Sequence, residues 1–290
     1  MSDQPFTGSS RNAFLASDGE TVNPNTHIGC FYASGDENGI YSQAGTTPKV
    51  SMALNKYWVG ANARGAEYDC FPFQQLVVLQ ILYLLMFQDT NCQTAFARGY
   101  VDSHTAVKSN TLWTYSNDFG MAGTAGTDDG KGMSFFWVHD LWGNMYQFIA
   151  SIFTRAGSSF EMYQVLGRMA DPNMWTDSSW NSTSSYAKQA NIGVTTGSTG
   201  KSLGNYYTKA CGTNGAGFII NSDSGTGTAS TYWPDYGRVD SSTSYAYFLS
   251  VGGYYYYSDR AGLFYAIVSV YSTYSNSYRG SRLSYRGGRT

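Results

Sequence analysis

The sequence predicts an α+β fold with one or two early helices, short antiparallel strands and long loops. Three observations support this prediction: one apolar stretch of helical length, aromatic and β-branched runs around a turn near residue 143, and a region rich in Ser, Thr, Gly and Asn between residues 171 and 232. With 290 residues, 42% of them hydrophobic, the chain can bury a large core. No unit repeats at a fixed period, which argues against solenoids and propellers.

Residues 1–50 are expected to form a strand-and-loop segment that packs on a body made by residues 51–290. This first part is rich in Gly, Ser, Thr, Asn and Pro, with short apolar interruptions such as IGCFYAS. Such a composition is typical of loops and short strands. The first residues lack the basic start and the apolar run of a secretory signal peptide. We therefore expect no signal-peptide-dependent export, unless a signal peptide was removed before residue 1.

The stretch FPFQQLVVLQILYLLMFQD, from Phe71, predicts a helix of about 16 residues that is buried on most sides. Pro72 is suited to its first turn. We expect Leu79, Leu82 and Phe87 to be nearly fully buried in this helix, and Trp142 and Phe148 to line the same core. The apolar run of residues 76–87 is too short to span a bilayer, which needs roughly 20 residues, so membrane insertion is not expected.

Farther along, Gly143-Asn144 predicts a turn, and the following MYQFIASIF predicts a strand. Residues 124–132, TAGTDDGKG, are expected to form a surface turn. Residues 171–232 are expected to form long loops joined by short strands.

Residues 195–204, TTGSTGKSLG, nearly match three catalytic signatures, and each match is incomplete. A phosphate-binding P-loop needs Gly where Thr195 stands, after an apolar strand. The G-x-S-x-G elbow needs a strand before Ser202 and a helix after it, and the flanking residues predict neither. Ser198 and Lys201 form S-x-x-K without its companion motifs. The segment is therefore interpreted as a polar loop, and no enzymatic activity is expected.

Metal and cofactor sites are not expected either. The three histidines, His27, His104 and His139, lack partners at metal-ligand spacing and are interpreted as hydrogen-bonded structural residues. Asp128 and Asp129 lie in a Gly-rich stretch without the calcium-loop spacing, which favours a solvated turn. The four cysteines are widely spaced and are interpreted as core thiols: Cys30, Cys70, Cys92 and Cys211. One disulfide bond between two of them remains an alternative.

Charge also restricts the partners. The net charge is −2 and only 13% of the residues are charged, so the chain carries no electrostatic signature for nucleic acid. Asn181-Ser182-Thr183 is a formal glycosylation acceptor that matters only in a eukaryotic secretory pathway.

The C-terminal region is unusually rich in tyrosine and serine. Of 25 tyrosines, 13 fall between residues 232 and 290, where uniform spreading would give about five. Tyrosine offers a stiff amphipathic surface, and Ser, Asn and Gly add adaptable hydrogen-bonding groups, which together are typical of a paratope. The alternative, Tyr-rich edge strands, requires a period of two that YYYYSD and YSTYSNSY lack.

Five residue types are missing from the same region. Between Asp240 and Thr290 there is no Trp, Lys, Glu, Gln or Met. Every residue present has a codon ending in a pyrimidine, and randomising the adenines of AAC-type codons never yields those five types. The pattern indicates a diversified segment.

Three short motifs frame this segment. The frame residues Gly252-Gly253, Ala261–Ala266 and Gly280–Arg286 resemble the variable region of proteins diversified by diversity-generating retroelements. Upstream, residues 143–148, GNMYQF, are similar to the GNVWEW-type motif of C-type lectin folds of the formylglycine-generating-enzyme subclass. The resemblance implies a C-type lectin fold for residues 51–290, with a variable ligand-binding region at about 240–286, as in phage tropism determinants. No C-terminal cysteine pair matches the copper ligands of the oxidases, and no EPN or QPD motif indicates calcium-dependent sugar binding.

The resemblance also implies which residues are fixed and which vary. Leu263, Phe264 and Leu283 belong to the fixed scaffold and are expected to be buried. The expected ligand-binding residues are the Tyr, Ser, Asn and Asp side chains of the variable region: Tyr245, Tyr247, Tyr254, Tyr255, Tyr256, Tyr257, Ser258, Asp259, Tyr265, Ser269, Tyr271, Ser272, Tyr274, Ser275, Asn276, Ser277 and Tyr278. Ten of them are expected to form one contiguous exposed surface: Tyr254–Asp259, Tyr271, Tyr274, Asn276 and Tyr278.

The expected function is non-enzymatic binding of varying targets from the surface of a virus particle. The expected partner is a protein or glycan receptor on the host cell, and copies of the chain or virion neighbours are possible further contacts. The alternatives are a structural virion protein that uses the Tyr-rich tail for subunit contacts, and a cell-surface adhesin.

Overall fold

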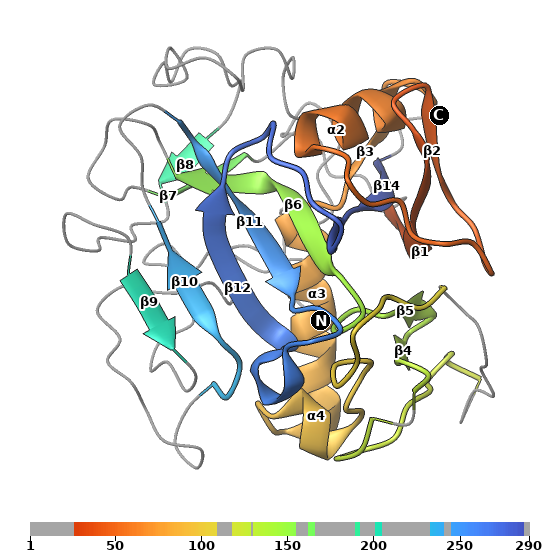
Figure 1. Cartoon of the computed structure of the whole chain (residues 1–290), viewed down its shortest axis with the longest axis vertical. Helices are drawn as coiled ribbons and strands as arrows, with labels where there is room; N and C mark the ends of the chain where they lie inside the picture. Colours follow the sequence, from red (N-terminus) through yellow and green to blue (C-terminus); the bar gives the residue numbers. More distant parts are fainter. Residues whose placement is uncertain are drawn as a thin grey trace, which may run out of the picture.

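The computed structural model describes residues 26–108, 118–128, 130–154, 233–240 and 245–286, together with the backbones of the short strands at 162–165, 189–191 and 201–204. These residues form an α+β structure, in which two sheets and a hairpin surround one long helix (Figure 1). The main landmarks of the fold are the helix α3 and the larger sheet. Residues 171–188, 192–200 and 205–232, which the sequence assigns to loops, lie outside the described residues, as do Asn181, Asp129 and Cys211.

The predicted helix is confirmed as α3, Phe73–Phe87. Pro72 stands at its N-cap, where its missing N–H costs no hydrogen bond. The buried N–H of Phe73, in the first turn, donates to Ser151 Oγ at 2.8 Å. The helix ends at Gln88, which adopts a left-handed conformation and donates its N–H to Leu84 O. Two shorter helices, α2 (Leu54–Asn62) and α4 (Cys92–Ala95), complete the helices of the described residues, with a 3₁₀ turn η4 at Ser258–Arg260.

The larger sheet has the strand order β8-β7-β6-β11-β12-β10-β9, and β13 pairs with the start of β6. Most pairs are antiparallel, whereas β10 with β12 and β13 with β6 are parallel. The strand predicted from MYQFIASIF is confirmed as β6, and Gly143 and Asn144 before it both adopt positive φ, as a tight turn requires. The strands are β6 (Tyr146–Thr154), β7 (Met162–Val165), β8 (Gln189–Asn191), β9 (Lys201–Gly204), β10 (Gly237–Val239), β11 (Tyr247–Gly252), β12 (Gly262–Val270) and β13 (Arg279–Gly280).

The smaller sheet has the order β2-β1-β14-β3 and joins the two ends of the described chain. Thr26 on β1 lies opposite Arg286 on β14. Residues 134–139 form a separate hairpin, β4-β5. The strands are β1 (Thr26–Asp36), β2 (Gly39–Ser42), β3 (Tyr68–Cys70), β14 (Arg282–Arg286), β4 (Ser134–Phe135) and β5 (Val138–His139).

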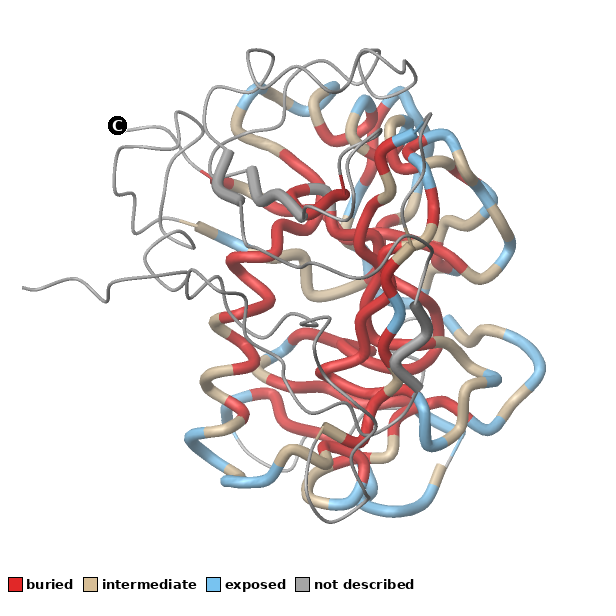
Figure 2. The backbone as a smooth tube through the Cα atoms, turned by 90° about the vertical axis from the view of Figure 1, so that its left-hand side faces the viewer, coloured by how far each residue is buried: buried red, intermediate tan, exposed pale blue. Residues whose placement is uncertain are grey.

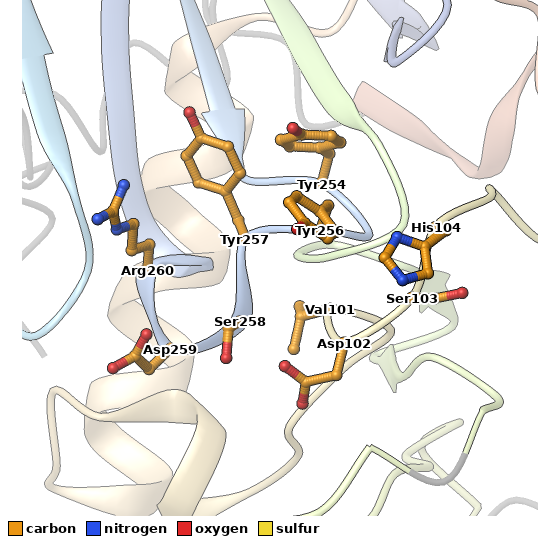
Figure 3. Close-up of a pocket in the computed structure, with 10 residues that line it drawn as sticks. All are labelled: Val101, Asp102, Ser103, His104, Tyr254, Tyr256, Tyr257, Ser258, Asp259 and Arg260. Atoms are coloured by element: carbon orange, nitrogen blue, oxygen red, sulfur yellow. The ribbon is translucent and has the colours of Figure 1, made fainter.

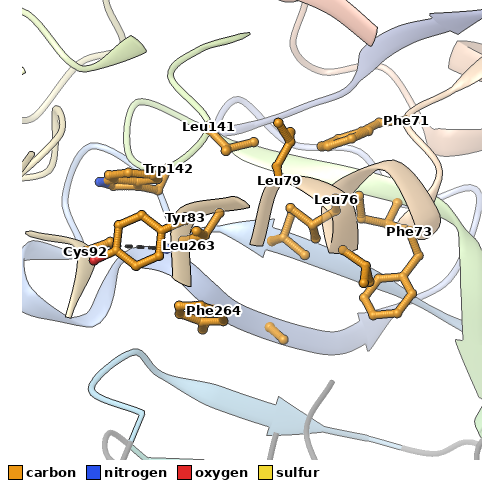
Figure 4. Packing of buried hydrophobic residues seen from close by; sticks show 14 of the residues in the cluster. Phe71, Phe73, Leu76, Leu79, Tyr83, Cys92, Leu141, Trp142, Leu263 and Phe264 are labelled. Atoms are coloured by element: carbon orange, nitrogen blue, oxygen red, sulfur yellow. Dashed lines mark hydrogen bonds between the residues drawn. The ribbon is translucent and has the colours of Figure 1, made fainter. Parts of the chain in front are cut away.

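The helix α3 packs on one face of the larger sheet. Tyr83 lies edge-on between Trp142 and Phe264, at ring-centroid distances of 6.4 and 6.1 Å (Figure 4). Leu79 is buried as predicted, but Leu82 and Phe87 are only half-buried and pack at the margin of this core. That part of the prediction is wrong because a helix that is apolar on nearly every face does not reveal which face meets the sheet.

The opposite face of the larger sheet carries two further clusters. Phe148 lies there with Phe248 and Val270, beneath α2, and so does not share the core of Trp142 as predicted. The alternation of side chains along β6 explains the difference, since Ile149 faces α3 and Phe148 faces away. Figure 2 shows the buried backbone continuing through α3 and the sheets, with exposed residues mainly in the loops. The predicted burial of Leu263, Phe264 and Leu283 is confirmed.

A fully buried arginine ties the two sheets together. Arg282 on β14 donates to Gln147 Oε1 at 2.9 Å, to the carbonyl oxygens of Gly29 and Cys30 at 3.0 and 2.8 Å, and to His139 O at 2.6 Å. Burial lowers the pKa of this guanidinium, and the nearby Tyr32, Asp140 and Cys30 act in the opposite direction.

Cys30, Cys70 and Cys92 are free thiols, and Cys92 Sγ accepts the Leu263 N–H at 3.2 Å. None of the helices in the described part of the chain has the length and hydropathy needed to cross a bilayer.

Candidate ligand-binding surface

Two tyrosine-rich loops cover the face of the larger sheet that lies opposite α3. The first, residues 253–261, connects β11 to β12 and contains η4. The second, residues 271–278, leaves the far end of β12 and leads to β13, which pairs with the start of β6. Because β13 lies beside Tyr146, the second loop runs back along the sheet, and Tyr278 meets Tyr254 of the first loop at 4.9 Å between ring centroids. The two loops therefore form one surface, which we call the tyrosine surface: residues 245, 254–260 and 271–278.

Main-chain hydrogen bonds from other parts of the chain hold the first loop. Tyr255 donates its N–H to Asn144 O at 3.0 Å, and its carbonyl accepts from the Ser103 N–H at 2.6 Å. Ser258 donates its N–H to Val101 O at 2.9 Å. These bonds do not depend on the side chains of the loop.

Side chains outside the loop add to this support. Gln93 Nε2 donates to the carbonyls of Ser258 and Ala261, at 2.8 and 2.7 Å. Arg98 links Gln93 Oε1 to Ser258 Oγ, with distances of 2.8 and 3.0 Å. Ser258 adopts φ of 49°, an uncommon conformation for a residue with a side chain, which these bonds stabilise.

The second loop is held in the same way. The N–H of Ser51 donates to Asn276 O at 2.8 Å, that of Asn55 donates to Ser272 O at 3.2 Å, and that of Tyr146 donates to Tyr278 O at 3.1 Å. Both loops thus have a fixed backbone path that leaves the outward side chains available for contact.

Two buried tyrosines of the sheet form the base of the surface. Tyr146 on β6 and Tyr265 on β12 join through their hydroxyl groups at 3.0 Å. Tyr254, Tyr257 and Tyr278 pack around Tyr146 with ring centroids 5.0, 5.6 and 5.9 Å away. Burial raises the pKa of Tyr146 far above its ordinary value, so its hydroxyl stays protonated.

Arg279 lies beneath the same rings. Its side chain is 5% exposed, and its guanidinium carbon lies 4.6 Å from the Tyr146 ring centroid and 5.7 Å from that of Tyr274. Arg279 Nη1 donates to Ser250 Oγ at 2.6 Å, and no carboxylate of the described residues forms a salt bridge with it. The electron-rich ring faces therefore stabilise its charge, while burial lowers its pKa.

The exposed part of the surface extends from one loop to the other. Tyr245 contacts Tyr271 at 5.2 Å, Tyr271 contacts Tyr274 at 5.9 Å, and Tyr274 and Tyr278 both adjoin Arg279. At the other end, Tyr256 is 59% exposed. Ten predicted residues share a partly or fully exposed position on these loops: Tyr254, Tyr255, Tyr256, Tyr257, Ser258, Asp259, Tyr271, Tyr274, Asn276 and Tyr278. Tyr245, Ser275 and Ser277 are exposed beside them.

Four predicted ligand-binding residues do not belong to the exposed surface. Tyr265 is 1% exposed because its position in β12 points it at Tyr146. Ser272 is buried beneath the second loop. Tyr247 is half-buried and packs on the α3 side of the sheet, because alternation along β11 turns it away from the loops. Ser269, half-buried within β12, lies in the strand rather than in a loop.

A cleft of about 630 Å³ opens between the first loop and residues 101–104 (Figure 3). The first loop contributes Tyr254, Tyr256, Ser258 and Asp259 to its lining, and the facing segment contributes Asp102 and His104. The Asp102 carboxylate accepts from Arg98 Nε and Nη2 at 2.8 and 3.1 Å, and this pairing lowers the pKa of Asp102. The cleft thus combines one wall from the first tyrosine-rich loop with one wall from residues 101–104.

Sequence reasoning missed several residues of this site. Tyr146 lies in the GNMYQF motif, and the aromatic residue of this motif could have indicated a buried tyrosine beneath the surface. Asp102 and His104 gave no signal, since they lie in a short polar stretch about 150 residues before the first loop. His104 is exposed against the Tyr256 ring at 5.1 Å, whereas His139 is buried and stacks on Phe31 at 4.7 Å, as a structural histidine would.

Two of the segments considered above for catalysis or metal binding lie within the described residues: Lys201–Gly204 and Asp128. Lys201–Gly204 forms strand β9 and is not a loop as predicted, because it extends the sheet beside β10. Asp128 accepts the N–H groups of Val101, Asp102 and Gly130, which accounts for both carboxylate oxygens. The described residues contain no cluster of His, Cys, Asp and Glu suited to a metal ion.

The chain matches no protein-family model and no curated protein.

Proposed function

We propose that this protein binds varying macromolecular targets through the tyrosine surface. One observation carries the proposal: the backbone of both loops is held by hydrogen bonds from residues outside them, while the tyrosine side chains form one continuous exposed face. A surface of this kind combines rigid aromatic contacts with a loop path that tolerates changes of side chain.

The proposal extends to fold and origin. A C-type lectin fold accounts for an α+β body that presents a diversified C-terminal region, and the missing residue types between 240 and 290 support diversification at adenines. We place the protein on the surface of a virus particle, where many copies would strengthen modest single-site affinity through avidity. A cell-surface adhesin would use the same face in the same way.

A display library tests the binding face directly. Tyr245, Tyr255, Tyr256, Tyr271 and Ser275 are randomised together, and the library is selected on immobilised lysozyme and serum albumin. We expect folded binders to emerge for both targets. A matched library randomises five exposed positions outside this face, namely Tyr41, Gln43, Lys56, Val59 and Ala63.

Two results would contradict the proposal. If most members of the first library are unfolded, the loop backbone depends on its tyrosines. If the first library yields no more binders than the second, this face has no special capacity for recognition. Diversification is tested separately by sequencing the gene locus, where we expect a reverse transcriptase gene and a near-identical repeat of the last coding segment that differs at adenines.

A further inference from the structure

The cleft described above has one wall that lies outside the diversified region, and this wall has a chemical character of its own. Residues 101–104 supply the Asp102 carboxylate, the Ser103 hydroxyl and the His104 ring. The backbone of this wall is fixed by Asp128, which accepts the N–H groups of Val101 and Asp102 at 2.9 and 2.8 Å. Whatever sequence the variable loop carries, this wall stays the same.

The rim of the cleft offers flat aromatic surfaces. The rings of His104 and Tyr256 lie 5.1 Å apart and are inclined by 37°. Tyr256 is 59% exposed, so much of its ring surface has no partner within the chain. An exposed aromatic ring is suited to contact with an apolar face of a ligand whose edge carries polar groups.

The opposite side of the cleft offers hydrogen-bonding groups of both kinds. The Asp102 carboxylate is oriented by two bonds from Arg98 and keeps lone pairs available for a ligand. Asp259 adds a further acceptor and Arg260 a further donor, and both side chains are exposed.

The charges along the cleft balance. Asp102 is paired with Arg98, and Asp259 is followed directly by Arg260. A phosphate or sulfate would meet two carboxylates, and a basic peptide would meet two guanidinium groups. The lining therefore matches a neutral ligand with one apolar face and a ring of hydroxyl groups.

We infer that this cleft binds the pyranose ring of a neutral hexose. The ring stacks on Tyr256 and His104, and its hydroxyl groups donate hydrogen bonds to the carboxylates of Asp102 and Asp259. This inference rests on the proposed function and names the ligand class for one part of its surface. The fixed wall supplies the contacts of Asp102 and His104, whereas Tyr256 and Asp259 come from the diversified loop. The cleft volume of about 630 Å³ lies within the range of ordinary small-molecule sites, roughly 300–1,000 Å³.

Saturation-transfer NMR on the full chain tests the inference, with methyl glycosides of glucose, galactose and mannose as probes. We expect signals from at least one hexoside, strongest for the ring C–H protons on one face. His104→Ala and Tyr256→Ala should each reduce the signal at least about fivefold, the effect of losing roughly 1 kcal/mol of binding free energy. Tyr41→Ala removes an exposed ring on β2, outside the tyrosine surface, and should leave the signal unchanged.

Each contrary outcome is informative. The inference is wrong if none of the three hexosides gives a signal, if a signal survives His104→Ala, or if a lysine-rich peptide competes for the cleft better than the sugars. In all three cases, binders from the display library would still support the proposed function. If the library yields no binders but a hexoside binds, the cleft is a sugar site and the proposal that the tyrosine surface binds varying targets is wrong.

Discussion

Tyr265 and Tyr256 lie nine residues apart in the same tyrosine-rich region, yet the structure predicts opposite consequences for their removal. Tyr265 is 1% exposed and contacts the rings of Tyr146, Tyr257 and Tyr236 at 5.5, 5.7 and 6.0 Å. Replacing it with Ala removes a buried aromatic ring from the base of the surface. We expect Tyr265→Ala to lower the free energy of unfolding by about 3–5 kcal/mol.

Two companion variants divide this value into its parts. Tyr265→Phe keeps the ring and loses only the hydroxyl bond to Tyr146, which predicts a loss of about 0.5–1.5 kcal/mol. Tyr256→Ala removes a ring that is largely exposed, which predicts a change within about 0.5 kcal/mol.

Urea unfolding followed by circular dichroism measures all three variants under one set of conditions. The expected order of destabilisation is Tyr265→Ala, then Tyr265→Phe, then Tyr256→Ala. The reasoning is refuted if Tyr256→Ala destabilises the protein as much as Tyr265→Ala, because the exposed rings would then be part of the core.

Three further predictions concern the buried polar groups. Arg282→Met should lower the free energy of unfolding by at least about 3 kcal/mol in urea, since it leaves several buried carbonyls without their donor; a loss below 1 kcal/mol would contradict this. Gln93→Met should cost about 1–3 kcal/mol and speed amide exchange at Ser258, although Gln93 does not lie on the exposed face; unchanged exchange would show that the loop is held without it. Burial and the nearby Arg282 lower the pKa of His139 from 6.5 to about 4, so its contribution to stability is present above pH 6.5 and is lost as the pH falls towards 4, by about 2 kcal/mol at pH 5. Because burial raises the pKa of Asp140 to about 6 and this acts in the opposite direction, the wild-type curve must be compared with that of His139→Gln, and identical pH dependence in the two proteins would refute the assignment.

The elements with strong local signals could be predicted from the sequence. The apolar run before Gln88 defined α3 closely, and the turn at Gly143-Asn144 located the start of β6. The burial of Leu263 and Phe264 was expected because the resemblance assigns them to a scaffold, and both are 1% exposed.

The remaining features depend on contacts between distant parts of the chain. Tyr247 and Tyr265 have the same composition around them as the exposed tyrosines, and only the strand pairing decides which face each one joins. The second wall of the cleft comes from Asp102 and His104, whose position beside Tyr256 requires the complete fold. No local pattern of residues carries that information.

The central position of β14 has a consequence for how the protein is made. This strand lies between β1 and β3, and its Thr26–Arg286 pair joins residues separated by nearly the whole chain. The smaller sheet and the Arg282 network can form only after ribosomes have completed both tyrosine loops, since β14 follows them in the sequence. A copy that ends within either tyrosine-rich loop therefore lacks the strand that joins β1 to β3. The edges of β1 and β3 would then be unpaired, and unpaired strand edges favour aggregation.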